Sequence, residues 1–287
     1  MVESRPDSAF KTALQNAPRN GLIDGFPVKM YLNGEFHGIY TWNIPKDGWM
    51  FGMDEDNPNH VVLCATLNSE GDGTTNSCQF RELWGGADDA SWEVEFGEAT
   101  EDIVNSFNKA ITSIINYTPD NGAAEPKIID KFDIDSLIDY YIFSDFCCHL
   151  DGLANNLLMV TYDGIKWGAS LYDMDTLFGA WWDGSTFVEP TYSCPDQYQE
   201  PNSKLWEALL QCFPYEIKKR YFELRNGALS LGNIITHAEN LYNSISDRMF
   251  ADEHEKWPNL PSVATNTITR FRNWLRDRAA IIDEKYR

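Results

Sequence analysis

The chain has 287 residues, 43% of them hydrophobic and 23% charged, which is ordinary for a globular protein that buries a sizeable core. Its formal net charge of −21 at pH 7 argues against binding to nucleic-acid backbones and anionic lipid headgroups, whereas a divalent cation or a basic partner would suit such a surface. No run approaches the roughly 20 apolar residues of a transmembrane helix, so we expect no membrane insertion.

The first part of the chain is predicted to be rich in β-strands. The opening MVESRPDSAF has no apolar stretch, so we expect no signal peptide in it, and a short helix is expected within SAFKTALQNA. From Phe26 to Ile44 two β-prone runs flank Asn33-Gly34, a pair that favours the positive φ angles of a two-residue hairpin turn. Another strand is predicted within HVVLCATL, and the composition of residues 69–77 is typical of a loop.

Two helices and a second hairpin are predicted next. A strand or turn in WEVEF precedes a helix that begins near Thr100, with an apolar stripe at Ile103, Phe107, Ile111 and Ile114. The segment DIDSLIDYYIFSDFCCHL predicts a second helix with Asp133 as its N-cap, and apolar residues on nearly every side indicate that it is buried. Two short strands joined at Asp163-Gly164 follow.

The rest of the chain is predicted to be mainly helical, with one helical stretch over NIITHAENLYNSISDRMF and another over TNTITRFRNWLRDRAAIIDEKYR. We expect RFRNWLRDR to present its four Arg on a solvated face, although a basic face could also meet an acidic partner. Strands first and helices after predict an α+β fold. A β-rich N-terminal lobe would span residues 1–132 and a mainly helical C-terminal lobe residues 133–287.

The six cysteines form no C-x-x-C pair, so we predict plain buried thiols rather than a zinc site. The adjacent Cys147 and Cys148 fall within the predicted buried helix. Spacing alone leaves the disulfide state, the compartment and the oligomeric state open.

Polar residues gather where the buried helix ends, in the stretch HLDGLANN. Asp151 is followed five positions later by Asn156, and Asp173 lies 22 positions after Asp151 (173 minus 151), beyond the second hairpin. In phosphoryl transfer by kinases, one Asp accepts the hydroxyl proton while an Asn and a second Asp hold magnesium on the nucleotide phosphates. Helix, loop, hairpin and Asp in this order would bring the three side chains to one cleft, so the spacing favours a kinase-like site.

Taken singly, each of these residues also has a structural explanation. Asp151-Gly152 alone is typical of a turn, and the two asparagines are typical of hydrogen bonding within a loop. Asp173 and Asp175 could cap the end of a strand. We expect His149 to hold the loop through a hydrogen bond rather than to bind a metal.

Three motifs in order resemble the spore-coat protein CotH kinase-like family. YLNGEFHGIYTWNI is similar to the hairpin of that family, HLDGLANNLLMVTYDGIKW to its D-x-x-x-NN segment, and LYDMDTLFG to its W-D-x-D-x-x-x-G segment. The resemblance extends from Phe26 to Arg287. The segment NIPKDGWMFGMDEDNPNH is more similar to members from gut bacteria and their phages than to the spore proteins.

The resemblance implies an atypical protein-kinase-like, bilobal fold with a reduced N-terminal lobe. It implies transfer of the ATP γ-phosphate, with Mg²⁺ or Mn²⁺, to Ser residues of a Ser-rich protein such as a coat protein. Asp151 would be the catalytic base, and Asn156 would act with it as a catalytic residue. Asn156 and Asp173 would be metal ligands supported by Asp175, and Asn155 would shape the loop.

The chain departs from the family pattern around the expected phosphate-binding lysine. The usual acid after the GIY strand is Asn43, and the LYK segment of the family is Leu63-Cys64-Ala65 here. Candidates for a replacement cation are Lys29, Lys46 and Arg81. Because few residues precede the hairpin, we expect the chain to be either a fragment of a longer polypeptide or a protein with a degenerate nucleotide site.

Two other functions therefore stay open. A catalytically inactive kinase-like module could serve as a structural or adhesion part of a phage tail or bacterial surface protein. A carbohydrate-binding or carbohydrate-active protein could use Trp181-Trp182 as a sugar platform beside Asp173 and Asp175, although packing in the core or at a cleft lip explains these Trp as well.

Overall fold

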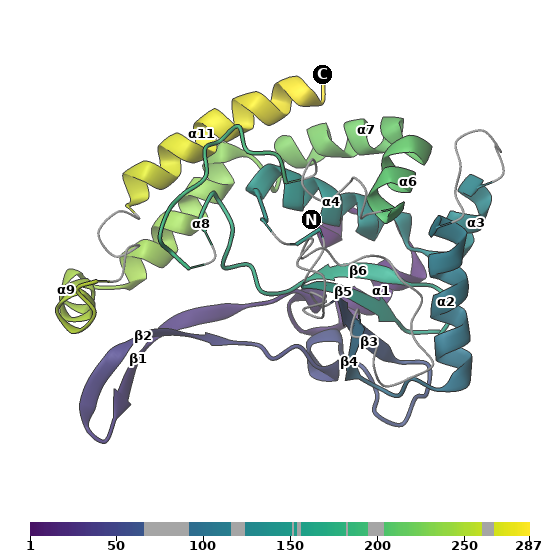
Figure 1. The fold of residues 1–287 in the computed structure, drawn as a ribbon, viewed down its shortest axis with the longest axis horizontal. Coiled ribbons are helices and arrows are strands. Elements are labelled where there is room, and N and C mark those ends of the chain that lie inside the picture. Colours follow the sequence, from purple (N-terminus) through teal and green to yellow (C-terminus); the bar gives the residue numbers. More distant parts are fainter. Residues whose placement is uncertain are drawn as a thin grey trace, which may run out of the picture.

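The computed structural model of the chain describes residues 1–65, 92–115, 124–150, 152–153, 156–181, 183–194, 204–259 and 267–287. Two antiparallel sheets and the helices around them give the α+β class predicted from the sequence (Figure 1). Within these ranges no helix combines the length and apolar character needed to cross a bilayer. The expected loop at residues 69–77 lies outside the described residues.

The predicted first hairpin is confirmed as β1 (Gly25–Leu32) and β2 (Glu35–Asn43). Leu32 pairs with Glu35, so the turn has two residues, Asn33 with φ 53° and Gly34 with φ 86°. Positive φ angles at both positions match the right-handed twist of the two strands. The hairpin forms a sheet of its own and extends away from the other strands toward α9 (Figure 1).

The central sheet has the strand order β4-β3-β5-β6, with every neighbouring pair antiparallel. Its strands are β3 (Val61–Ala65), β4 (Trp92–Phe96), β5 (Leu157–Thr161) and β6 (Gly168–Leu171). Every residue of β3 and β5 is buried, which explains why both strands are apolar apart from Thr161. Because β3 pairs with β5, one sheet joins strands from before and after residue 132.

Short-range capping sets where the helices around this sheet begin. In α1 (Ala9–Asn16) the Ser8 hydroxyl accepts the Lys11 N–H at 3.0 Å. In α4 (Ile134–Cys147) Asp133 accepts the Ser136 N–H at 2.9 Å, which confirms the predicted N-cap. The helices α2 (Glu101–Ile115) and α3 (Ala124–Lys131) lie at one end of the sheet (Figure 1).

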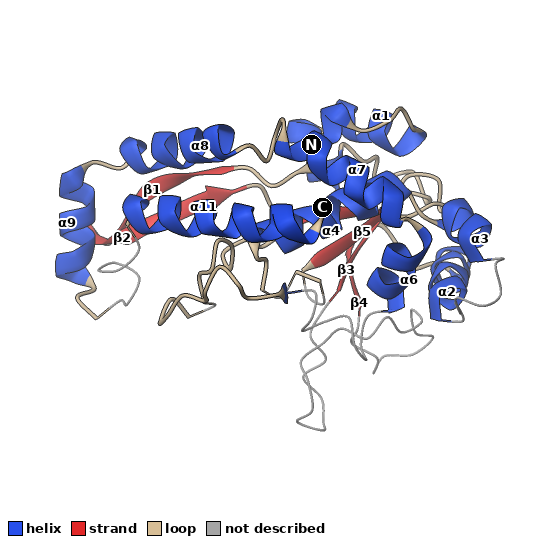
Figure 2. Ribbon diagram, turned by 90° about the horizontal axis from the view of Figure 1, so that it is seen from above, coloured by secondary structure: helices blue, strands red, loops and turns tan. Residues whose placement is uncertain are grey.

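The remaining described residues form α6 (Lys204–Cys212), α7 (Pro214–Arg225), α8 (Leu231–Ser244), α9 (Asp247–Lys256) and α11 (Ile268–Lys285). The predicted helical character of NIITHAENLYNSISDRMF is confirmed, but the segment divides into the two helices α8 and α9. Ser246 starts the second helix by accepting the Met249 N–H at 3.3 Å. As a result α9 turns across the end of the hairpin, beyond α8 and α11 (Figure 2).

The prediction that all four Arg of RFRNWLRDR are solvated is wrong. Arg278 is 1% exposed and donates to main-chain carbonyls on two segments, among them Phe146 O at 3.4 Å and Pro190 O at 2.7 Å. It therefore ties the end of α4 to the segment that follows Glu189. A guanidinium has five N–H groups in a planar fork, which lets one side chain satisfy several carbonyls at once.

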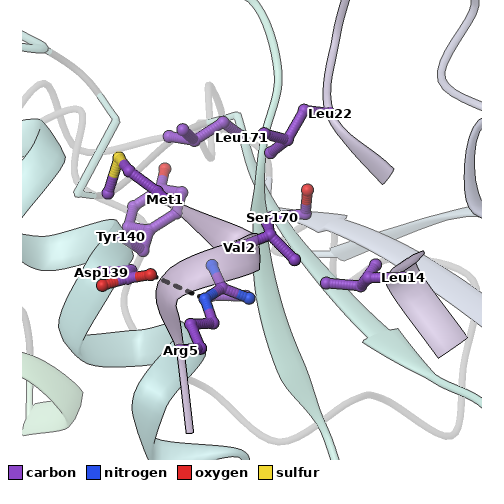
Figure 3. Close-up of a pocket in the computed structure, with 10 residues that line it drawn as sticks. Met1, Val2, Arg5, Leu14, Leu22, Asp139, Tyr140, Ser170 and Leu171 are labelled. Carbon is purple, nitrogen blue, oxygen red and sulfur yellow. Dashed lines mark hydrogen bonds and ion pairs between the residues drawn. The ribbon is translucent and has the colours of Figure 1, made fainter. Parts of the chain in front are cut away.

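A second buried ionic group lies beside the N-terminal segment. Asp139 in α4 accepts from Arg5 Nε and Arg220 Nε, each at 2.7 Å. Figure 3 shows the Arg5–Asp139 pair beside a cavity of about 20 Å³ between α4, β6 and the first residues of the chain. This volume is close to what one water molecule needs.

Candidate active site

The buried helix α4 ends in the loop that contains the HLDGLANN motif. Cys148 is its C-cap with φ 56°, and the fully buried His149 follows. The His149 Nε2 lies 3.2 Å from the Asp173 carbonyl oxygen, and since a carbonyl only accepts, Nε2 carries the proton in this contact. The predicted structural hydrogen bond of His149 is thus present, and it joins the loop to the Asp173 segment.

Close packing against His149 explains why the motif has a glycine at position 152. A Cβ atom added at Gly152 would lie 1.9 Å from His149 Nδ1, so no other residue fits without movement of the imidazole. The carbonyl of Gly152 accepts a hydrogen bond from the Tyr140 hydroxyl, and the carbonyl of Leu153 accepts one from Trp206 Nε1 at 2.7 Å. Asp151 and Asn155 lie outside the described residues, and these contacts hold the backbone of Gly152 and Leu153.

Asn156 and Asp173 are brought to the same end of the central sheet. Leu157 pairs with Leu171, so Asn156, directly before β5, and the residues directly after β6 leave the sheet side by side. The Asn156 N–H donates to Ala65 O at the end of β3, 3.1 Å away. Asn156 has φ 58° and Asp173 φ 47°, a left-handed conformation that Asn and Asp tolerate better than most residues.

A groove of about 730 Å³ lies between the first hairpin, the Asp173 segment and the end of α8, and we call it the hairpin groove. Its polar lining includes Asp24 and Asn43 from the hairpin ends and the exposed Asp173 and Asp175. Tyr40 of β2 lines the same groove. The volume is within the range of small-molecule sites, so a nucleotide could be accommodated.

Carboxylate and amide oxygens are the hard donors that magnesium requires, and Asp173, Asp175 and Asn156 supply such donors. Among the described residues no three His, Cys, Asp or Glu lie close enough to hold a metal ion without help. Magnesium in nucleotide sites uses only one or two protein carboxylates, because phosphate oxygens and water complete its shell. The donor set therefore fits a metal that arrives with a nucleotide.

Of the two candidate cations that the structure describes, Lys29 and Lys46, Lys46 lies beside the Asp173 segment. Its Nζ is 2.6 Å from Glu95 Oε1 on β4, and 5.7 Å from the ring centroid of Tyr172, which directly precedes Asp173. Lys29 instead pairs with Asp252 of α9 at 3.4 Å, and Arg81 lies outside the described residues.

The environment of Lys46 keeps its ammonium group charged. Partial burial alone would lower the pKa of Lys46, but the hydrogen bond to Glu95 and the negative charges around it raise the pKa above its ordinary value. The Nζ also lies 3.7 Å from the Cys64 Sγ, and burial raises the pKa of that thiol to about 11.

Glu95 and Tyr172 lie beside Lys46 at the candidate site, and the sequence did not single them out. Glu95 lies in the strand WEVEF, in which alternate side chains point to the same face. This alternation was the one indication in the sequence that Glu95 could face a neighbouring residue. Its pairing with Lys46 joins residues 49 positions apart (95 minus 46), a contact that no local pattern specifies. Tyr172 could have been identified as a neighbour of the site only from its position directly before Asp173.

The proposed sugar platform receives little support from the described residues. Trp181 is half-buried and packs against the main hydrophobic core, and its main-chain N–H donates to Thr186 O at 3.1 Å. Trp182 lies outside the described residues. Trp181 therefore has the packing role that was the simpler of the two explanations.

Comparison with known proteins identifies the family of the chain. The sequence model of the CotH kinase protein family matches residues 24–282, which is nearly the whole chain. No curated protein matches the chain. The family match covers the hairpin, the central sheet, the loop after α4 and the C-terminal helices together, and the chain therefore belongs to the CotH kinase protein family.

Proposed function

We propose that the chain is a protein kinase that transfers the γ-phosphate of ATP to Ser or Thr residues of a Ser-rich protein. The observation that carries the proposal is the register of β5 and β6, which sets Asn156 and the Asp173 segment at one sheet end, where the Asp173 segment lines the hairpin groove. A bilobal kinase-like arrangement, with ATP between the first hairpin and the loop after α4, is part of the same proposal.

Each residue has a role that its chemistry suits. Asp151 would accept the proton of the attacking hydroxyl, and Asn156 and Asp173 would hold Mg²⁺ or Mn²⁺ with support from Asp175. A divalent metal supplies positive charge that stabilises the phosphate oxygens during transfer. The contact of His149 with the Asp173 carbonyl would keep the proton-accepting loop and the metal-binding segment in a fixed relation.

Lys46 would bind the α- and β-phosphates in place of the lysine that the family resemblance leads one to expect where Ala65 stands. Kinases steady their phosphate-binding lysine with a glutamate, and the ion pair between Lys46 and Glu95 has this form. The Lys46 side chain is about one-third exposed, so a ligand can approach it from solvent.

We expect Lys46→Ala to weaken ATP binding about 10- to 100-fold, because a hydrogen bond to a charged group contributes about 1.5–3 kcal/mol. Lys29→Ala is the matched control, since it removes a lysine of similar exposure that pairs with Asp252, and its ATP affinity should stay unchanged. Titration calorimetry in the presence of Mg²⁺ measures both. Equal losses in the two variants would show that Lys46 has no special part in binding.

The proposed activity is tested by incubating the chain with γ-labelled ATP, Mg²⁺ or Mn²⁺, and a Ser-rich acceptor protein. Label recovered as phosphoserine or phosphothreonine supports the proposal. If the chain binds ATP but transfers phosphate neither to its own residues nor to acceptors, it is a nucleotide-binding module and not a kinase.

A second candidate function is a catalytically inactive kinase-like module of a phage tail or bacterial surface protein. It is favoured by Asn43, which lines the hairpin groove where the family resemblance leads one to expect an acid, and by Ala65 at the expected lysine position. This candidate predicts no metal-dependent ATP binding, whereas the kinase proposal requires it.

A further inference from the structure

Two buried thiols from distant parts of the chain meet at the base of the candidate active-site loop. Cys148 is the C-cap of α4, and Cys194 lies 46 residues later. Their sulfur atoms are 3.5 Å apart, and both residues are 0% exposed. The adjacent Cys147 is buried as well, so contact between thiols distinguishes Cys148 from its neighbour.

The two thiols are chemically unequal. Cys194 donates a hydrogen bond to the Cys148 sulfur, and this bond lowers the pKa of Cys148 and raises that of Cys194. Burial raises the pKa of Cys147. Because the thiolate is the reactive form, Cys148 is the better nucleophile of the neighbouring pair Cys147 and Cys148.

The segments that carry the two sulfurs are held in place by the same helix. Arg278 of α11 donates to Phe146 O near the end of α4 and to Pro190 O on the segment before Cys194. Trp274 Nε1 of α11 donates to Val188 O at 2.8 Å on that segment. Two anchored segments lose little further conformational freedom when their thiols join, which favours a bond between them.

We propose that Cys148 and Cys194 form a disulfide bond in oxidising surroundings and so lock the base of the loop that carries Asp151. The Cys148 thiolate attacks one sulfur of a low-molecular-weight disulfide, which forms a mixed disulfide and releases one small thiol. Cys194 then loses its proton and attacks the Cys148 sulfur, which displaces the second small thiol. In total two protein thiols are oxidised, with loss of two protons and two electrons, and the small disulfide is reduced to two thiols.

Formation of this bond requires the two sulfur atoms to move closer together. The sulfur atoms approach from 3.5 Å to the bonded distance of about 2.05 Å. Since both thiols are buried, the small disulfide reaches them during folding or during local opening. His149 follows Cys148 directly and contacts the Asp173 carbonyl, so the bond would tighten the side of the loop that faces Asp173.

The test is peptide mapping of the full chain after refolding in a buffer of oxidised and reduced glutathione, with remaining thiols blocked by iodoacetamide. We expect a cross-linked pair of peptides that contain Cys148 and Cys194 in the wild type and in Cys147→Ser, and none in Cys148→Ser or Cys194→Ser. The Tm of the wild type should fall by roughly 5–10 °C when dithiothreitol is added, and Cys148→Ser should show no such dependence.

Two results would overturn the proposal. One is a wild-type chain whose Cys148 and Cys194 are both alkylated after folding in the oxidising buffer. The other is a cross-link to Cys194 that disappears in Cys147→Ser and persists in Cys148→Ser, which would assign the bond to the neighbouring thiol. Mapping of the wild type decides the first point even if a variant fails to fold. Neither readout depends on kinase activity, so failure here is distinguishable from failure of the proposed function.

Discussion

Replacing Asp151 by Asn is expected to lower the rate of phosphoryl transfer about 10²- to 10⁴-fold while leaving metal-dependent ATP binding in place. The amide of Asn cannot accept the proton of the attacking hydroxyl, but it keeps the size of the side chain. The effect should therefore fall on kcat rather than on the affinity for ATP. Single-turnover transfer of label from γ-labelled ATP to a Ser-rich acceptor measures the rate.

Asp130→Asn serves as the matched control for this substitution. Asp130 is an exposed acid in α3, so its replacement removes the same charge far from the loop after α4. The control should transfer phosphate at the wild-type rate. An unchanged rate in Asp151→Asn would remove Asp151 from the mechanism, since no other acid of the motif is assigned the role of base.

The largest effect on folding is expected for Asp139→Ala, with a loss of about 3–5 kcal/mol in the free energy of unfolding. Asp139 is 0% exposed and pairs with both Arg5 and Arg220. Its removal leaves the buried Arg5 without its carboxylate and leaves Arg220 with the longer contact to Glu223 at 3.4 Å, which costs more than the ion pairs themselves contribute. Urea unfolding followed by circular dichroism measures the change.

An exposed ion pair provides the comparison for this variant. Asp277 pairs with Arg276 at 3.0 Å, and both side chains are more than half exposed. Asp277→Ala should change the free energy of unfolding by less than about 1 kcal/mol. A loss below about 1 kcal/mol in Asp139→Ala would show that water reaches the Arg5 and Arg220 groups.

Much of the local structure was predictable because it is set by residues close together in sequence. Asn33-Gly34 specified the first hairpin, Asp163-Gly164 the second, and Asp133 the start of the buried helix. Each of these turns and caps depends on a particular residue type within a segment of about four residues. The residues themselves therefore indicate where the turn or helix start lies.

Contacts between distant segments were not predictable in the same way. Nothing local indicates that β3 pairs with β5, that Lys46 meets Glu95, or that Arg278 is buried against carbonyls of two segments. The division between α8 and α9 was missed because the apolar pattern continues through it, while Ser246 restarts the helix. The spacing of the motifs predicted one part of the candidate site correctly. Because β5 and β6 form one hairpin, Asn156 lies beside the Asp173 segment.

The central claim is that the hairpin groove binds ATP through a metal held at Asp173. Titration calorimetry with ATP, with and without Mg²⁺ or Mn²⁺, on the wild type and on Asp173→Ala tests it most directly. We predict binding that requires the metal and that is lost in Asp173→Ala, because the loss of a metal ligand removes the charge that holds the phosphates. Absence of binding in the wild type, or equal binding in both proteins, would contradict a kinase-type nucleotide site.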